Sequence, residues 1–215
     1  MSCICHFTYY ICIAEAYKKS DLSFSYTIMR GCAPLLTSLA MLFFNVSLSL
    51  GAWCGVLLLC CGIFCLAGDN ARRGADRSAI LLSLRTSFVI MGYTLADGLG
   101  ARHSGSAVSY ACWIFVLNIL PLNTFIFWRH GLSYARYVRK RAAIGFFGGL
   151  AGLGSYGIAI WAMTIAPIAM VAALRETSVI FGMLLAVVLL HEKFTFWRGI
   201  AVVLVAFGAM ILKLT

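Results

Sequence analysis

Residues 142–165 of the chain read AAIGFFGGLAGLGSYGIAIWAMTI, and no charged side chain interrupts them. About 20 apolar residues in a row are enough for an α-helix to cross the hydrocarbon core of a bilayer. Lipid offers the backbone no hydrogen-bond partners, so such a segment must satisfy its N–H and C=O groups internally, as a helix does. The stretch therefore predicts a transmembrane helix.

Similar apolar runs follow one another along the rest of the chain with short breaks between them. With residues 142–165 included, they are approximately Ile4–Tyr17, Leu22–Phe44, Leu48–Ala67, Ala79–Leu99, Ala107–Trp128, Ala142–Ile165, Pro167–Leu190 and Trp197–Leu212. The first run is short for a full span, and the others are long enough. We therefore expect an all-α membrane protein with about eight transmembrane helices.

The composition agrees with lipid as the solvent. Apolar residues make up 62% of the 215 residues and charged residues only 11%, whereas soluble domains have roughly 45–50% and about 25%. The net charge of +10 first suggests nucleic acid as a partner. A nucleic-acid binder needs a broad basic face on a soluble body, and no such body is predicted here, so we expect no nucleic-acid partner.

The basic residues are distributed unevenly between the breaks. Most fall in alternate connections, which share one side of the membrane if there are eight spans: Lys18, Lys19, Arg72, Arg73, Arg77, Arg129, Arg136, Arg139, Lys140, Arg141, Lys193 and Arg198. The opposite side carries only Arg102 and Lys213. The positive-inside rule predicts that the richer side is cytoplasmic, with both chain ends outside.

Patterns typical of enzymes and metal proteins are missing from the sequence. It contains no phosphate-binding Gly-x-x-x-x-Gly-Lys loop, no His-Glu-x-x-His pair and no Gly-x-Ser-x-Gly elbow. The nine cysteines are an odd number, several of them lie within one apolar run, and small apolar thiols suit a helix in lipid. We therefore expect no enzymatic activity, no cofactor and no metal site.

A weak repeat relates the two halves of the chain. Arg30 opens an apolar run that reaches Asn45, and Arg175 opens another that reaches Glu192. The helices that follow, Gly55–Leu66 and Gly199–Leu212, also correspond. Repeats with an odd number of helices are inverted in the membrane, and inverted repeats are typical of transporters that bind substrate between them near the midplane.

These segments resemble the EamA-type repeats of the drug/metabolite transporter (DMT) superfamily. The second repeat is indicated by Tyr93–Gly98, Ala166-Pro167, Leu174-Arg175-Glu176-Thr177-Ser178, Leu190-His191-Glu192-Lys193 and Gly208–Leu212. The first is indicated by Ala16-Tyr17, Asp21-Leu22-Ser23, Tyr26, Arg30-Gly31, Ala33-Pro34 and Trp53–Val56. The resemblance covers nearly the whole chain, and its motifs define the superfamily better than the substrate.

The resemblance implies ten helices in two inverted five-helix repeats. We expect residues 1–67 to be an incomplete first repeat of three helices, 68–78 a polar linker and 79–215 a second repeat of five helices. The first two helices of the family are then lacking. Two interpretations stay open: a secondary transporter of small metabolites that works by alternating access, and a truncated or partner-dependent protein without transport activity of its own.

Ionisable and aromatic side chains within the runs are the candidates for a substrate site, because charge in lipid is costly and is retained mostly for function. Our predicted substrate-binding residues are Arg30, Arg175, Glu176, Tyr93 and Trp161. An arginine offers a planar fork of donors, which favours an anionic substrate. Neighbours on a helix do not face each other, so Arg175 and Glu176 must each find a partner on another helix.

Other residues allow narrower predictions. Asp97 is a candidate for proton coupling, although a charge in the headgroup region near a helix end is the simpler interpretation. We expect Gly145, Gly148, Gly149 and Gly152 to form a face on which another helix approaches closely. The expected surroundings are the lipid bilayer of the plasma or inner membrane, crossed several times, with a small-molecule substrate. A homodimer is an open alternative to a monomer.

Overall fold

A computed structural model describes residues 1–19, 22–45, 48–71, 77–181 and 196–214. All regular structure among these residues is helical, and no strand occurs in them. The helices are α1 (Ser2–Lys19), α2 (Leu22–Phe43), α3 (Leu50–Ala71), α4 (Arg77–His103), α5 (Ala107–His130), α6 (Leu132–Lys140), α7 (Ala142–Ile165), α8 (Ile168–Arg175) and α10 (Phe196–Leu214). The prediction of an all-α fold is confirmed.

Three of the described helices, α4, α5 and α7, are long and apolar enough to cross a membrane. Shorter apolar helical segments lie at Ile28–Phe43, Leu50–Cys65 and Gly199–Leu214. One predicted span differs from the structure. The run Pro167–Leu190 was expected to be continuous, but α8 ends at Arg175 and the chain continues through tighter turns; the part of the run beyond residue 181 lies outside the described residues.

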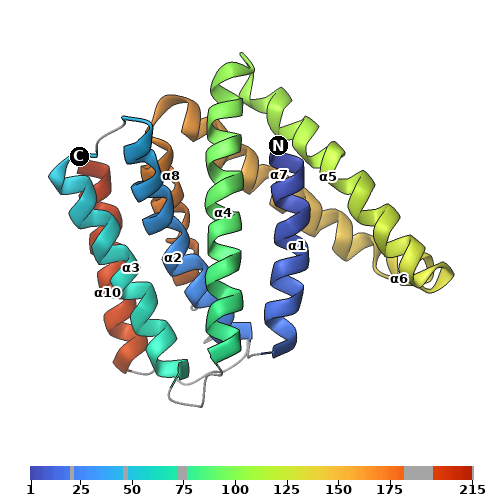
Figure 1. Cartoon of the computed structure of the whole chain (residues 1–215), viewed down its shortest axis with the longest axis horizontal. Coiled ribbons are helices and arrows are strands. Elements are labelled where there is room, and N and C mark those ends of the chain that lie inside the picture. The colour runs from blue at the N-terminus through green and yellow to red at the C-terminus, as the bar shows by residue number, and fades with distance from the viewer. Residues whose placement is uncertain (20–21, 46–47, 72–76, 182–195, 215) are drawn as a thin grey trace.

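The helices are arranged around α4, as Figure 1 shows. On one side lie α2 and α8 and then the pair α3 and α10; on the other lie α1 and the long hairpin made by α5, α6 and α7. The start of α4, the start of α10 and the end of α1 share one end of the bundle. Arg77, Lys18 and Arg198 therefore lie at a common end, as the alternating basic connections predicted; Arg72, Arg73 and Lys193 lie outside the described residues.

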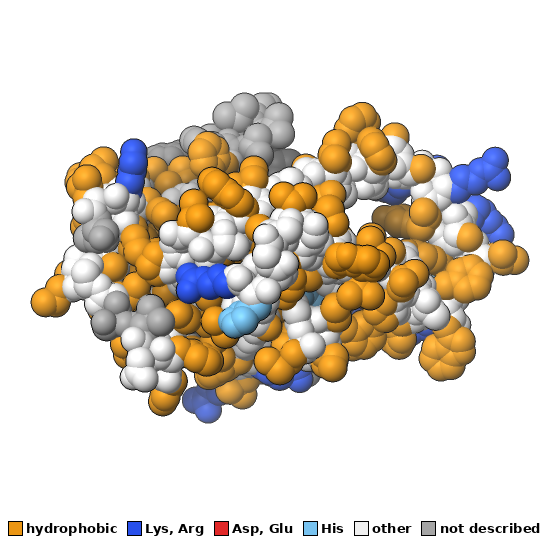
Figure 2. Space-filling view, turned by 90° about the horizontal axis from the view of Figure 1, so that it is seen from above, with side chains coloured by type: hydrophobic (Ala, Val, Ile, Leu, Met, Phe, Trp, Pro, Cys, Tyr) orange, Lys and Arg blue, Asp and Glu red, His pale blue; other side chains and the backbone are white. Residues whose placement is uncertain are grey.

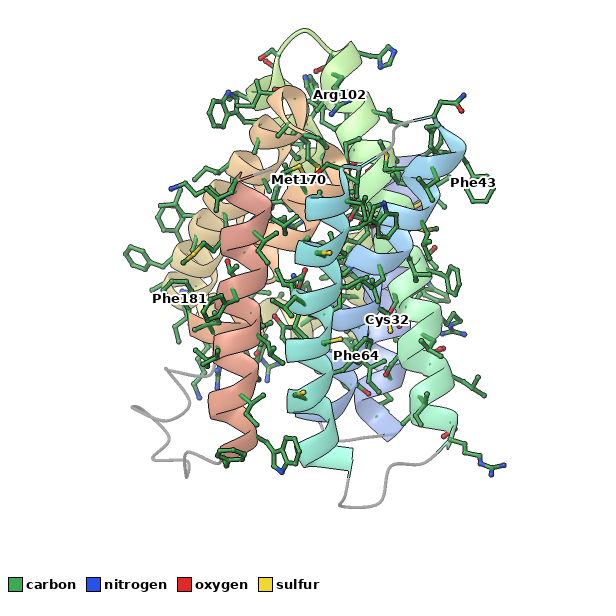
Figure 3. All side chains as sticks on the ribbon, turned by 90° about the vertical axis from the view of Figure 1, so that its left-hand side faces the viewer. Cys32, Phe43, Phe64, Arg102, Met170 and Phe181 are labelled. Atoms are coloured by element: carbon green, nitrogen blue, oxygen red, sulfur yellow. The ribbon has the colours of Figure 1, made fainter. Side chains whose placement is uncertain are left out.

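The opposite end of the bundle carries little charge. Figure 2 looks onto it: apolar side chains dominate, no acidic side chain is in view, and basic side chains are scattered, with one group beside a histidine near the centre and others toward the edges, including the right-hand edge, where α6 lies. Arg102 is labelled near this end in Figure 3. Its guanidinium donates to the carbonyls of Met163 at 2.8 Å and Ala166 at 2.7 Å. These carbonyls end α7 without helical partners, so Arg102 fixes the turn from α7 to α8.

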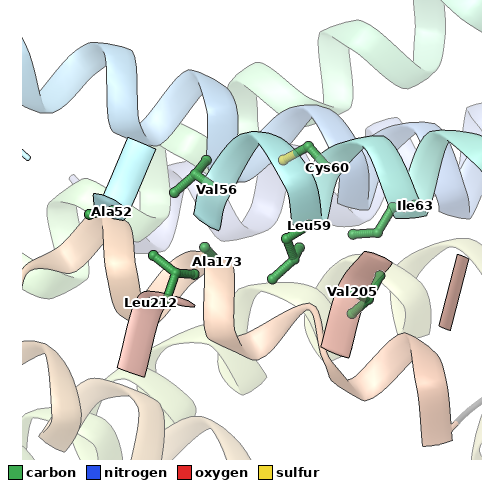
Figure 4. Packing of buried hydrophobic residues seen from close by; sticks show 8 residues of the cluster. All are labelled: Ala52, Val56, Leu59, Cys60, Ile63, Ala173, Val205 and Leu212. Atoms are coloured by element: carbon green, nitrogen blue, oxygen red, sulfur yellow. The ribbon is translucent and has the colours of Figure 1, made fainter. Parts of the chain in front are cut away.

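The tightest packing joins α3 and α10, which lie side by side in Figures 1 and 3. Figure 4 shows the cluster between them, in which α3 directs apolar side chains toward α10 and α8. The cluster consists of Ala52, Val56, Leu59, Cys60, Ile63, Ala173, Val205 and Leu212. Because lipid is as apolar as these side chains, the contact is stabilised by close van der Waals packing and not by removal from water.

Glycines make this close approach possible. A Cβ at Gly208 would lie 2.7 Å from the backbone nitrogen of Leu59 and 2.8 Å from the carbonyl oxygen of Gly55. A Cβ at Gly62 would lie 2.9 Å from the carbonyl oxygen of Ala201. A carbon atom does not pack favourably this close to another heavy atom. Only hydrogen fits at these positions, so the glycines set the separation of the two helices.

The predicted glycine face of α7 finds no packing partner among the described residues. At Gly145, Gly148, Gly149 and Gly152, an added Cβ would meet no described atom within 4 Å. The small-residue packing that the sequence suggested for α7 is instead found between α3 and α10. The reason lies in the hairpin, which carries this half of α7 away from the other helices, so that it meets no neighbour within the described chain (Figure 1).

Candidate functional site

A cavity of about 290 Å³ lies among α1, α2, α4, α5, α7 and α8. Aromatic and apolar side chains form most of its wall, with Phe115, Ile119 and Leu122 contributed by α5. Its polar lining includes Arg30, Arg175, Tyr93, Tyr156 and His6. A concave, largely apolar space with a few converging polar groups is the usual form of a small-molecule site.

The structure brings together the two arginines that the sequence repeat related to each other. Arg30 lies on α2 and Arg175 ends α8, and both line this cavity. Each stands beside an interruption of its helix. Pro34 has no N–H and leaves the carbonyl of Arg30 without its helical partner. After Arg175 the backbone bonds become i→i+3, with Glu176 N–H donating to Ala173 at 3.0 Å.

Glu176 forms the ion pair that the sequence required from another helix. Its Oε1 accepts from Arg30 Nη1 at 3.1 Å, and the side chains are 6% and 26% exposed. The pair ties the end of α8 to α2. The second carboxylate oxygen of Glu176, Oε2, is buried without a hydrogen-bond partner among the described residues. Glu176 therefore supports Arg30 from behind and does not line the main cavity, although it lines a smaller pocket with Arg30 and Arg175. Its predicted role in substrate binding stays a prediction.

Arg175 has no carboxylate partner in the described part of the chain. Its guanidinium carbon lies 4.9 Å from the centre of the Tyr156 ring, and the guanidinium of Arg30 lies 5.2 Å from that of Tyr26. The face of an aromatic ring attracts a cation, so each tyrosine stabilises the arginine above it. Counting Glu176 against the two arginines leaves one positive charge at this wall of the cavity. None of the described residues that line the cavity carries a carboxylate.

Asp97 lies deep in the structure, next to the opposite wall. It is 0% exposed, and its predicted place in the headgroup region stays a prediction. Tyr156 donates a hydrogen bond to Asp97 Oδ2 at 2.5 Å, Tyr110 donates to Oδ1 at 3.3 Å and the Ser2 hydroxyl also donates to Oδ1. His6 Nε2 lies 3.7 Å from Oδ2. Asp97 is buried because α5, α7 and α1 cover this part of α4.

A comparison with known protein families gave a match over most of the chain. The model of the EamA-like transporter family matches residues 77–214. This chain belongs to the EamA-like transporter family. It is therefore a multi-pass membrane protein and a membrane transporter of the DMT superfamily, as the resemblance predicted. A comparison with curated proteins found no match.

Two of the predicted residues take different places in this EamA-like transporter. Tyr93 is buried and lines the cavity, as proposed for it. Trp161 is 53% exposed on α7 and is not among the residues that line the cavity, so the structure gives no support to its predicted role in binding. The sequence does not distinguish the face of α7 that lines the cavity from the opposite face, because both are apolar. Outside the cavity, Arg85 of α4 forms an ion pair with Glu15 of α1.

Several cavity residues of the EamA-like transporter were missed at the sequence level. His6 and Tyr9 belong to the first apolar run, and no sequence pattern singled them out. Asn118 and Asn123 lie within an apolar run of α5, and this was an available signal, since amides in a span need partners. No group of three or more metal-binding side chains occurs in the described ranges.

Proposed function

We propose that the chain is a secondary transporter that binds a small anionic metabolite in the central cavity and exposes it alternately to the two sides of the plasma or inner membrane. The observation that carries the proposal is the convergence of Arg30 and Arg175 on one cavity from distant parts of the sequence. With only one carboxylate beside them in the described part of the chain, the pair has a surplus positive charge there. An anion would offset this charge, since an unbalanced charge in the membrane interior is costly.

The two arginines have different tasks in this proposal. Arg30 is held by Glu176 and contributes a positioned donor on a rigid support. Arg175 keeps its guanidinium free of carboxylates in the described residues and so is the main ligand for the anion. The tyrosines and Phe115 contact the apolar part of the substrate. A planar guanidinium pairs with a carboxylate or phosphate through two parallel hydrogen bonds, which a lysine cannot do.

Alternating access is supported by the interruptions beside both arginines. Broken helices near the site are typical of secondary transporters, because they place free backbone groups and flexible joints at the substrate. The break after Arg175 and the proline in α2 supply two such joints. Movement of α8 relative to α2 would have to rearrange the Arg30–Glu176 pair, which links the substrate site to the conformational change.

The test uses purified protein in liposomes loaded with a small-molecule extract of cells, with efflux followed by mass spectrometry. We expect a set of anions to leave liposomes with wild-type protein. Arg175→Gln should slow their efflux by about 10- to 150-fold, which corresponds to one charged hydrogen-bonding contact of about 1.5–3 kcal/mol. Arg175→Lys should be intermediate, because charge is kept and the fork is lost.

Arg136→Gln is the matched control, because it removes an exposed arginine of α6 that does not line the cavity. It should transport as the wild type does. Anion efflux at the wild-type rate by well-folded Arg175→Gln protein would refute the binding role. Efflux of neutral or cationic compounds alone would refute the anionic substrate class.

A further inference from the structure

His6 and Asp97 form a buried pair beside the cavity that the anion site does not use. His6 lies on α1 and is one of the lining residues, whereas Asp97 lies on α4 directly behind it. His6 Nε2 and Asp97 Oδ2 are 3.7 Å apart. The His6 ring stacks on Tyr93 with centroids 4.4 Å apart, which holds the imidazole in this position.

For an ionised Asp97, the hydrogen bonds of Ser2 indicate which nitrogen of His6 carries a proton. The single hydroxyl hydrogen of Ser2 is donated to Asp97 Oδ1. The Ser2 carbonyl, 3.1 Å from His6 Nδ1, can only accept, as can the Ser2 hydroxyl oxygen 3.2 Å away. His6 Nδ1 must therefore be the donor. In a neutral imidazole, Nε2 then presents a lone pair to Asp97 Oδ2, so two acceptors face each other.

One added proton resolves this arrangement. Placed on His6 Nε2, it turns two opposed acceptors into an imidazolium facing a carboxylate. Histidine is the side chain whose protonation normally changes between pH 5 and 8. The proton can arrive from the cavity, since His6 lines it. The site therefore has a receiver in contact with the cavity and a fully buried counter-ion behind it.

A second contact joins this pair to the proposed anion site. The hydroxyl of Tyr156 donates to Asp97 Oδ2 at 2.5 Å, while the face of its ring lies 4.9 Å from the guanidinium carbon of Arg175. Tyr156 thus contacts both charged groups. The titratable groups that face the His6–Asp97 pair from the packed helices are Cys3 and Tyr9 of α1, Tyr93 of α4, Tyr110 of α5, Tyr156 of α7 and, beyond it, Arg175 of α8.

We propose that His6 and Asp97 form a proton-binding site and that the proton and the anion cross the membrane together, in the same direction. The coupling rests on the proposed transport function. Its sign follows from charge: a proton adds one positive charge close to Tyr156 and Arg175, which favours the anion. By reciprocity a bound anion favours the proton. His6 receives the proton, Asp97 is its counter-ion, and Tyr156 is a positioning residue between the two sites.

The proton site is tested first without any substrate. Protein carrying ¹⁵N-labelled histidine is reconstituted in lipid, and the ring nitrogen signals are followed by NMR between pH 5 and 8. His6→Gln identifies the His6 signal by its loss. We expect this signal to titrate in wild-type protein. In Asp97→Asn it should stay neutral over the range, because an imidazolium in this buried position loses its counter-ion.

Coupling is tested in liposomes that contain the cell extract, with a pH gradient across the membrane. One proton per anion predicts about tenfold accumulation for each pH unit, for those anions whose movement Arg175→Gln slows. Asp97→Asn should still equilibrate these anions but should not accumulate them. His103→Gln is the matched control, because it removes an exposed histidine at the end of α4. It should accumulate anions as the wild type does.

Each result decides one part of the proposal. A His6 signal that titrates identically in wild type and Asp97→Asn would overturn the proton site. Normal titration combined with accumulation that ignores the pH gradient would overturn the coupling and leave the transport function standing. If wild-type protein moves no anion at all, the proposed function and the coupling both fail, and the NMR result alone decides whether the pair binds a proton.

Discussion

Substitution of Gly208 by alanine should separate α3 from α10 and destabilise the protein. The new Cβ would lie 2.7 Å from Leu59 N and 2.8 Å from Gly55 O, both rigid backbone atoms. Comfortable contact needs about 3.5 Å, so the helices must move apart by roughly 0.5–1 Å. Overpacking of this kind costs about 1–3 kcal/mol. The higher helix propensity of alanine returns about 1 kcal/mol of it.

Gly149→Ala provides the matched control. It makes the same chemical change within a helix, but its Cβ would meet no described atom within 4 Å, so only the helix-propensity gain of about 1 kcal/mol remains. The two variants should therefore differ by the overpacking alone, about 1–3 kcal/mol. At about 2–4 °C per kcal/mol for a chain of this size, their melting temperatures should differ by roughly 2–12 °C.

The assay is thermal unfolding of both purified variants in the same detergent, at one heating rate, because membrane proteins often unfold irreversibly. Equal melting temperatures for Gly208→Ala and Gly149→Ala would refute the packing between α3 and α10. A melting temperature of Gly149→Ala well below that of the wild type would show instead that α7 packs through its glycines, as the sequence suggested.

Two further predictions concern the ion pair and the topology. Glu176→Gln leaves Arg30 without a counter-ion and should lower both the stability and the melting temperature; the loss of stability should lie in the lower part of the 3–5 kcal/mol typical of a broken buried pair, because Arg30 is 26% exposed. An unchanged melting temperature would contradict this prediction. Glu15→Gln, at an exposed ion pair, is the control. A cysteine in place of Arg136, in a background without other reactive cysteines, should resist labelling by impermeant thiol reagents in intact cells, because α6 is expected on the cytoplasmic side. Ready labelling from outside would show that the predicted topology is wrong.

The arginines of the cavity could be predicted from the sequence because charge within an apolar run is rare and costly. Arg30 and Arg175 stood out on that ground, and the weak repeat placed them in corresponding positions. Glu176 also had to find a partner on another helix, and it found Arg30. Tyr93 was selected with Trp161 for being aromatic, and only Tyr93 lines the cavity. Composition could not separate the two.

His6 and the burial of Asp97 could not be predicted. Both lie near the ends of their apolar runs, where a charged or polar group ordinarily reaches the headgroups. What buries Asp97 is the crossing of α1, α5 and α7 over one part of α4, which brings Ser2, Tyr110 and Tyr156 to its oxygens. Such contacts join segments far apart in the chain, and no local pattern reports them.

The sequence alone determined that this chain lies in a membrane, where its helices run and which charges lie within them, because lipid excludes unpaired backbone groups and penalises charge. Only the tertiary structure decided which faces meet. Lipid and neighbouring helices are equally apolar, so an apolar side chain carries no signal of which one it contacts. The glycines in the first half of α7 therefore meet no described neighbour, while Gly208 of α10 packs against α3.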